Sequence, residues 1–439
     1  MWYNVGVKKN FLRLAGKAQM REASRAVLLQ PARAPGSFAG GEIGRGERFM
    51  KAIRNGRCIV PGAAGAFEVV DGQVLLYDAD GIAGLMPEAD FAAGVAIAAE
   101  EVIDAGGRYV APGFLNVHIH GCKGSDTMDA TQEALGAMQA FLPRTGVTAF
   151  LPTTMTCAWQ EIAAALTAVR TAMQTPRAGA QVLGAHMEGP FISPAKKGSQ
   201  AEENILRADY ARLAPFADVV RIVTVAPEEV RDAAFFAACR RAGIRVSIGH
   251  TAADYETACR AVRAYGASRF THLYDAMQGF HHRAPGVVGA AVDTDAYVEL
   301  IADNVHACPM AQRLAYRVKG KDRVILITDA LRACGMGDGL SELGGQQVFV
   351  KGELATLADG TIAGSVATMN RCLRLFLENT GASIADAVAM VTKNPAEDLG
   401  IYGERGSLTP GKRADITIFD EQIAVYDTII GGRRLGPFA

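Results

Sequence analysis

Eight apolar runs of strand-like composition alternate with alanine-rich amphipathic segments through the middle of this 439-residue chain. Such alternation is typical of an α/β fold in which helices connect parallel strands and cover both faces of the sheet. Eight strands in one domain predict a (β/α)8 TIM barrel over residues 109–399, with functional residues at the carboxyl ends of the strands. The runs are YVAPGFLNVHIH, GVTAFLPTTMT, AQVLGAHMEGP, VVRIVTVAPE, IRVSIGHT, ASRFTHLYDAM, YVELIADNVH and RVILITDA.

Short alternating strands with turn signals flank this region in residues 50–108 and 400–439. Each part contains a dipeptide typical of hairpin turns, Asp71-Gly72 in the first and Gly431-Gly432 in the second. Strands that are split between the two ends of a chain usually pair with one another. We therefore expect a small β-sandwich domain built from both ends of the chain.

Residues 1–49 differ in composition from the rest, with nine Lys and Arg against three Asp and Glu. They contain scattered Gly and Pro and no sustained apolar period, so we expect a mostly disordered extension. A basic segment of this kind also resembles an organelle-targeting peptide. The simpler interpretation is that the protein naturally starts at Met50, where the first strand begins.

The composition gives no sign of nucleic acid or a membrane as a partner. A net charge of −1 gives no reason to expect nucleic acid, and no apolar run is long enough to predict a membrane span. The eight cysteines are scattered without a CxxC pair, which favours reduced thiols in a cytoplasmic protein.

Histidines and acids gather at the ends of the predicted strands. His118 and His120 are two residues apart on one strand, so both side chains leave the same face. Six of the eight strands bring a residue of this kind to the same rim of the barrel, and random placement would scatter them over helices and loops. They are His118, His120, His186, Glu188, His250, His272, His306 and Asp329.

Imidazoles with a carboxylate form the donor set that zinc and iron(II) prefer. Glu188, His250 and His272 can hold one divalent ion and leave a position open for water. His118 and His120 can hold a second ion, with Glu188 as a bridge.

Asp329, at the end of the eighth strand, is then the candidate general base and general acid. The alternative for Asp329 is a structural role as the N-cap of the following helix.

Several motifs in order along the chain resemble the amidohydrolase superfamily, and within it the N-acetylglucosamine-6-phosphate deacetylases. The resemblance runs from about Met50 to the C-terminus, and HMEGPFI, THLYDAM and HHRAPG carry most of it. The other motifs are PGFLNVHIHG, SIGHT, ITDA, TIAGS and NPAEDLGIYGERGSLTPGKRADITIFD.

The resemblance implies metal-dependent removal of an acetyl group from an amino-sugar phosphate. It assigns the metal to Glu188, His250 and His272 and the acid–base role to Asp329. Zinc or iron is the implied ion. One ion is the minimum, and the His118–His120 pair leaves a second one open.

The same resemblance implies the substrate contacts. Asp275 and Ala276 stand where the family has an Asn-Ala pair that contacts the phosphate, and His306 stands where a histidine contacts the substrate. Gln200 occupies the place of a histidine that touches the sugar. Arg283 corresponds to an arginine that binds the phosphate of a neighbouring subunit, so a homodimer is implied.

Departures from the family pattern leave alternatives open. A carboxylate at Asp275 should repel a phosphate dianion, and together with Gln200 it makes the galactosamine epimer a credible substrate. A ring-opening amidohydrolase is a second alternative, but the fourth strand ends in VTVAPEE without the lysine that such enzymes use. A barrel that has lost catalysis is a third, although it should lack at least one of the residues above.

Overall fold

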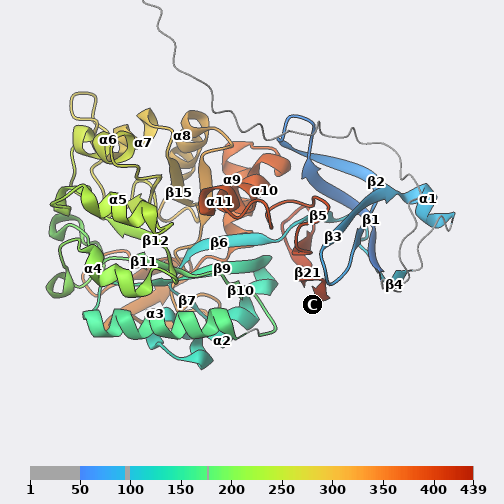
Figure 1. Ribbon diagram of the computed structural model, residues 1–439, viewed down its shortest axis with the longest axis horizontal. Helices are drawn as coiled ribbons and strands as arrows, with labels where there is room; N and C mark the ends of the chain where they lie inside the picture. The colour runs from blue at the N-terminus through green and yellow to red at the C-terminus, as the bar shows by residue number, and fades with distance from the viewer. Residues whose placement is uncertain (1–49, 94–98, 176, 439) are drawn as a thin grey trace, which may run out of the picture. The chain divides into compact units, whose positions relative to one another are not determined.

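The computed structural model describes residues 50–93, 99–175 and 177–438, which all fall within the compact unit Arg48–Ala439 (Figure 1). The extension predicted over residues 1–49 lies outside the described residues. No helix in the described part is long and apolar enough to cross a membrane.

Parallel strands form the predicted (β/α)8 barrel, which is confirmed. Each strand pairs with its neighbour in chain order, and an isolated bridge between Ile119 and Ala330 joins the first strand to the residues after the last. The third strand is built from two pieces, β10 and β11, which both pair with β9. The strands are β6 (Phe114–Ile119), β9 (Val147–Thr154), β10 (Gln181–Val182), β11 (Ala185–Glu188), β12 (Val220–Val225), β13 (Arg245–Ile248), β14 (Arg269–Phe270), β15 (Tyr297–Ile301) and β16 (Val324–Ile327).

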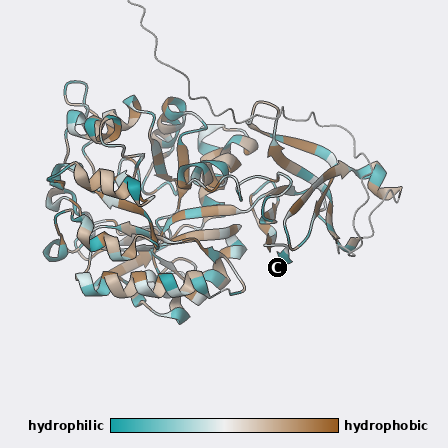
Figure 2. Cartoon of the chain, in the orientation of Figure 1, coloured by the Kyte–Doolittle hydropathy of each residue, from teal (hydrophilic) through white to brown (hydrophobic). Residues whose placement is uncertain are grey.

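Helices surround these strands and cover their outer face (Figure 1). Every residue of β9 is buried, as expected for a parallel strand covered on both sides. The strands are accordingly apolar, while the helices turn hydrophilic faces outward (Figure 2). Thr131, Asp254 and Ser383 accept hydrogen bonds from backbone N–H groups at three helix starts. The helices are α2 (Gln132–Phe141), α3 (Trp159–Gln174), α4 (Tyr210–Leu213), α5 (Ala234–Arg241), α6 (Tyr255–Arg263), α7 (Gly286–Asp293), α8 (Pro309–Lys319), α9 (Met369–Thr380), α10 (Ile384–Val391) and α11 (Lys393–Leu399).

The β domain combines strands from both ends of the described chain in one hydrogen-bonded sheet. Ile82 of β3 and Ile429 of β21 share one apolar cluster although their strands are far apart in the sheet, so the sheet curls around its own core. A short helix, α1 (Glu88–Ala92), follows β3. The strands are β1 (Met50–Pro61), β2 (Phe67–Tyr77), β3 (Ile82–Pro87), β4 (Ala99–Asp104), β5 (Tyr109–Pro112), β20 (Ile416–Phe419), β21 (Val425–Ile430) and β22 (Arg433–Arg434).

The run that was expected to form one strand over residues 109–120 forms two, and that expectation is wrong. β5 pairs with β1 and β20 of the β domain, whereas β6 pairs with β9 of the barrel. The chain passes between the two sheets at Gly113, where a Cβ atom would lie 2.2 Å from the side chain of Thr148. Apolar character alone does not show which sheet a buried strand joins.

A three-stranded antiparallel sheet is inserted after the last barrel strand. It consists of β17 (Gly339–Leu343), β18 (Gln346–Lys351) and β19 (Leu354–Thr356). Its Gln346 side chain donates a hydrogen bond to the carbonyl of Ser199, in the loop after β11, at 2.7 Å. A further small hairpin, β7 (Gly121–Cys122) with β8 (Ser125–Asp126), follows β6.

Aromatic rings join the β domain to the barrel. The ring of Phe419, on β20, lies 5.6 Å from that of Tyr109 and 5.7 Å from that of Phe114 between centroids. Hydroxyl groups of Thr417 and Thr428 donate to backbone carbonyls of the barrel segment 143–146. The two parts therefore share one packed boundary.

We expect Phe419→Ala to lower the free energy of unfolding by about 3–5 kcal/mol, because it leaves a cavity in this boundary. Urea denaturation of the variant measures the loss. Phe280, which is 64% exposed, provides the matched control, and its replacement by Ala should change the free energy by less than about 0.5 kcal/mol. A loss of unfolding free energy in Phe419→Ala as small as that in the control would mean that the boundary contributes little to stability.

Candidate active site

The strand-end residues predicted from the sequence meet at one rim of the barrel. Each lies on the last residues of a strand or within two residues beyond it. All of them are buried, which places their polar atoms in a low-dielectric environment where mutual interactions are strong. They are His118, His120, Glu188, His250, His272 and Asp329.

Glu188 is the centre of the first cluster. Its Oε1 atom lies 3.2 Å from Nε2 of His250 and 2.9 Å from Nε2 of His272. The two Nε2 atoms are 3.1 Å from each other. Three donor atoms this close together can bind one divalent ion, as anticipated for these residues.

A second cluster adjoins the first and shares Glu188. Asp329 Oδ1 lies 3.2 Å from Nε2 of His118 and 3.1 Å from Nε2 of His120. The Oε2 atom of Glu188 is 3.2 Å from Nε2 of His120. These four residues can hold a second ion, with Glu188 between the two positions.

The hydrogen bonds on the far side of the rings show that a cation fits this site. The Nδ1 atoms of His120 and His250 face the backbone carbonyls of Thr153 and Lys196, which only accept hydrogen bonds. Each Nδ1 must therefore carry the proton, and Nε2 presents a lone pair to the carboxylates. Lone pairs and carboxylate oxygens face one another stably only with positive charge between them.

The pKa values of these groups reflect the same demand for positive charge. Burial lowers the pKa of His120, but hydrogen bonds to Asp329 and Glu188 outweigh it and raise the pKa to about 10. Burial also lowers the pKa of His272, and its hydrogen bond to Glu188 raises it to about 9. Burial raises the pKa of Glu188, yet the charges of His118 and His250 hold it well below its usual range. The raised pKa values mean that the rings of His120 and His272 hold a second proton. A divalent cation would take the place of these ring protons.

The backbone is strained at three of the predicted functional residues. His250, His272 and Asp329 have φ angles of 46°, 27° and 49°, in the left-handed region that residues with a Cβ rarely adopt. Such conformations cost free energy and cluster at functional sites, where the surrounding structure holds them. At each of these positions the chain has just left a barrel strand.

A cavity of about 230 Å³ opens beside the two clusters. Four of the five predicted substrate contacts line it: Asp275, Ala276, His306 and Gln200. Burial raises the pKa of Asp275 to about 6 despite the nearby His306 and His272. The inserted sheet and the segment after it contribute Leu343 and Ile362 to the lining of the cavity.

Gln200 and Arg283, the other predicted contacts with side-chain interactions of their own, are placed differently from each other. The amide group of Gln200 donates to Oε2 of Glu188 at 2.9 Å and accepts from the backbone N–H of Thr156 at 2.7 Å. It therefore orients a candidate metal ligand. Arg283 is exposed on the loop before α7, contacts His282, and does not line the cavity.

Sequence reasoning missed buried groups beneath the site. Glu299 lies 2.9 Å from Nδ1 of His118 and is paired with Arg269, and both are fully buried. Burial raises the pKa of Glu299, but the charges of Arg269 and His118 hold it at about 2. The sequence did carry a signal for these groups, because Arg269 and Glu299 are charged residues inside apolar strand runs.

His186 was also among the strand-end residues and lies near His118 and Glu299, but both of its ring nitrogens have hydrogen-bond partners of their own. Its Nδ1 faces the carbonyl of Val117 at 3.0 Å, and its Nε2 faces the hydroxyl of Thr224 at 2.8 Å. It is therefore occupied by structural hydrogen bonds.

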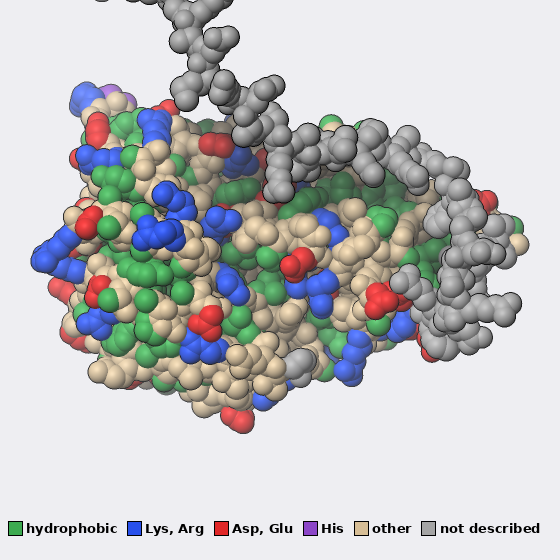
Figure 3. All heavy atoms as spheres, in the orientation of Figure 1, with side chains coloured by type: hydrophobic (Ala, Val, Ile, Leu, Met, Phe, Trp, Pro, Cys, Tyr) green, Lys and Arg blue, Asp and Glu red, His purple; other side chains and the backbone are tan. Residues whose placement is uncertain are grey.

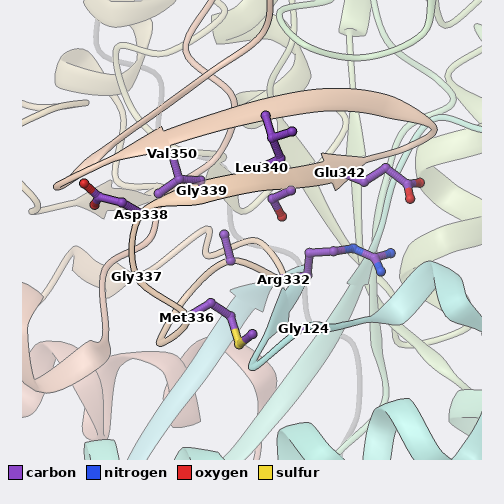
Figure 4. A pocket seen from close by; sticks show the side chains of 11 residues that line it. Gly124, Arg332, Met336, Gly337, Asp338, Gly339, Leu340, Glu342 and Val350 are labelled. Carbon is purple, nitrogen blue, oxygen red and sulfur yellow. The ribbon is translucent and has the colours of Figure 1, made fainter.

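A separate hollow of about 400 Å³ lies under the β17–β18 hairpin (Figure 4). Met336 and Leu340 line it together with Arg332, whose guanidinium pairs with Asp129 at 2.8 Å. None of the described metal-type clusters lies in this hollow. On the face shown in Figure 3, acidic and basic side chains are interspersed.

The model of the amidohydrolase family matches residues 109–435. The chain belongs to the amidohydrolase family. Among its relatives, N-acetylglucosamine-6-phosphate deacetylase of Bacillus subtilis is 43% identical over 329 residues, 73% of this chain and 83% of that protein. N-acetylgalactosamine-6-phosphate deacetylase of Escherichia coli O157:H7 is 37% identical over 327 residues, 73% of this chain and 86% of that protein.

Solved structures of this family of amidohydrolases share the architecture. N-acetylglucosamine-6-phosphate deacetylase from Pasteurella multocida superposes with a TM-score of 0.82 at 30% identity, over 88% of this chain and 100% of that one. A variant from Mycobacterium smegmatis in complex with N-acetyl-D-glucosamine-6-phosphate has a TM-score of 0.79 at 27% identity, over 89% of this chain and 99% of that one. The described fold, barrel and β domain together, is therefore that of an amidohydrolase.

We expect His250→Ala and His272→Ala each to remove most of the bound metal, because each takes a nitrogen from the Glu188 cluster. Elemental analysis of the purified variants measures the loss. Replacing His118 and His120 together should cost at most the second ion. His186→Gln is the matched control and should keep the wild-type content, and full retention in both Ala variants would contradict the assignment.

Proposed function

We propose that this chain hydrolyses the acetamide bond of N-acetyl-D-glucosamine 6-phosphate and releases D-glucosamine 6-phosphate and acetate. The observation that carries the proposal is the convergence of Glu188, four imidazoles and Asp329 beside one cavity. Relatives at 43% and 39% identity bear the name of this activity. The reaction is the hydrolysis of a linear amide C–N bond in amino-sugar metabolism.

Zinc or iron(II) suits the imidazole and carboxylate donors of the site. One ion would lie between Glu188, His250 and His272, and the cluster of His118, His120 and Asp329 offers a second position. When bound, such an ion polarises the amide carbonyl and makes a nearby water more acidic. Gln200 and the backbone carbonyls behind the rings keep the ligands in orientation.

Asp329 is placed to move the protons of the reaction. Burial raises its pKa, but His118 and His120 hold it well below the usual range, so the side chain is ionised. An ionised carboxylate beside the cavity has the free lone pair that a general base needs. It lines the cavity, where the amine of the product must gain a proton before it leaves. The same group can deliver that proton.

Binding of a phosphate needs a positive group that the described cavity does not supply, because no Lys or Arg lines it. We infer that Arg283 of a second copy provides it, which makes the functional unit a homodimer. The exposed position of the Arg283 loop supports this assignment. His306, held by Asp303 at 2.7 Å, remains within the cavity for a sugar hydroxyl.

All eight cysteines are free and seven of them are buried. Buried, unpaired thiols fit the proposed cytoplasmic location.

Asp275 favours a second candidate, the deacetylation of N-acetylgalactosamine 6-phosphate. Asp275 lines the cavity, and its Oδ2 atom is buried without a hydrogen-bond partner, so this carboxylate has an acceptor left for a sugar hydroxyl. A relative at 37% identity bears that name.

We expect Asp329→Asn to lower kcat by about 10²–10⁴-fold, because the amide keeps the shape of the side chain but cannot take up the proton. KM should change little. Steady-state kinetics together with metal analysis measures both effects. Asp126→Asn, another buried carboxylate near the site, is the control and should retain most of kcat. A variant that failed only through a raised KM would make Asp329 a binding residue.

A panel of N-acetylated sugars tests the substrate. We expect kcat/KM to be highest for N-acetylglucosamine 6-phosphate, then the galactosamine epimer, and far lower for both sugars without phosphate. Asp275→Asn should raise kcat/KM for the phosphorylated sugars by about tenfold, since it removes a negative charge near the dianion. An equal rise for the unphosphorylated sugars would show that Asp275 does not sense the phosphate.

A further inference from the structure

Three charged side chains form a buried cluster in the barrel interior, beneath the candidate metal site. Arg269, on β14, donates to Oε1 of Glu299 on β15 and to Oδ2 of Asp398 on α11, both at 2.6 Å. Arg269 and Glu299 are fully buried, and Asp398 is 4% exposed. Burying charges carries a large desolvation cost, and apolar replacements are often equally stable. Stability alone therefore gives little reason for this cluster.

The cluster reaches the candidate metal site through Glu299. The Oε2 atom of this residue lies 2.9 Å from Nδ1 of His118, on β6. The same atom accepts the backbone N–H of His272 at 3.3 Å, where the chain has its left-handed conformation. One carboxylate thus contacts two candidate ligands that come from different strands of the barrel.

The contact decides which nitrogen of His118 carries the proton. A carboxylate only accepts, so Nδ1 donates and Nε2 presents its lone pair toward Glu188 at 3.5 Å and Asp329 at 3.2 Å. His120 and His250 are oriented in the same way, but by backbone carbonyls. Of the four candidate imidazole ligands, His118 alone is oriented by a side chain, so only its orientation can be removed by substituting the partner.

We propose that Glu299 is a positioning residue that fixes the ring and tautomer of His118 for metal binding, and that Arg269, clamped by Asp398, holds Glu299 in place. The inference rests on the proposed metal-dependent function. In Glu299→Gln the amide can donate to Nδ1, which moves the ring proton to Nε2 and blocks the lone pair. In Glu299→Asp the charge remains for Arg269, but the shorter side chain withdraws from the ring.

The test is calorimetric titration of zinc into metal-free protein. We expect both Glu299 variants to bind zinc at the position involving His118 about 10–100-fold more weakly than the wild type, the usual effect of losing such a supporting partner. The visible spectrum of the cobalt-loaded proteins should change in the same variants.

Asp427→Asn is the matched control. Asp427 is a fully buried carboxylate that pairs with Arg434 at 2.6 Å in the β domain, away from the metal clusters. It should lower thermal stability and leave zinc affinity unchanged.

Two outcomes overturn the inference. One is that both Glu299 variants bind zinc as tightly as Asp427→Asn does. The other is that neither variant folds, which would make the cluster part of the core and not the support of one imidazole. Failure of the wild type itself to bind zinc, iron or cobalt would instead refute the proposed function.

Discussion

The backbone hydrogen bonds that close the barrel also bring the residues of the candidate site together. The backbone N–H of Asp329 donates to the carbonyl of His118 at 3.0 Å, and that of His120 donates to the carbonyl of Ala330 at 2.9 Å. These bonds join the first strand to the residues that follow the last one. They bring the His118–His120 pair next to Asp329 although more than 200 residues separate them in the chain. A barrel that did not close would have no second cluster.

Several features of the candidate site oppose folding. Left-handed backbone at His250, His272 and Asp329 costs of order 1–2 kcal/mol per residue. Carboxylates and imidazole lone pairs crowd together at buried positions beside the cavity. The rigid strands before each residue hold these conformations, and a bound cation would relieve the crowding. The site is thus built for a charge that the polypeptide itself does not supply.

The candidate residues of the rim could be predicted because metal ligation and proton transfer use few residue types, and parallel strands bring such residues to one edge. His118, His120, Glu188, His250, His272 and Asp329 all followed from that rule, and they lie together. The supporting residues followed no such rule. Glu299 and Arg269 occur within apolar runs, and their partner Asp398 is 129 residues beyond Arg269 on a helix. No local period indicates that this helix places a carboxylate inside the barrel.

The number and type of barrel strands, the pairing of the two chain ends and the identity of the candidate site residues were all present in local patterns, since burial and strand periodicity act over a few residues. Three-dimensional packing alone decided the rest. It divided the 109–120 run between two sheets at Gly113, turned Gln200 toward Glu188, left Arg283 on the surface, and placed one carboxylate behind His118. Each of these depends on which side chains meet across long separations in the chain, and sequence spacing carries no information about such distances.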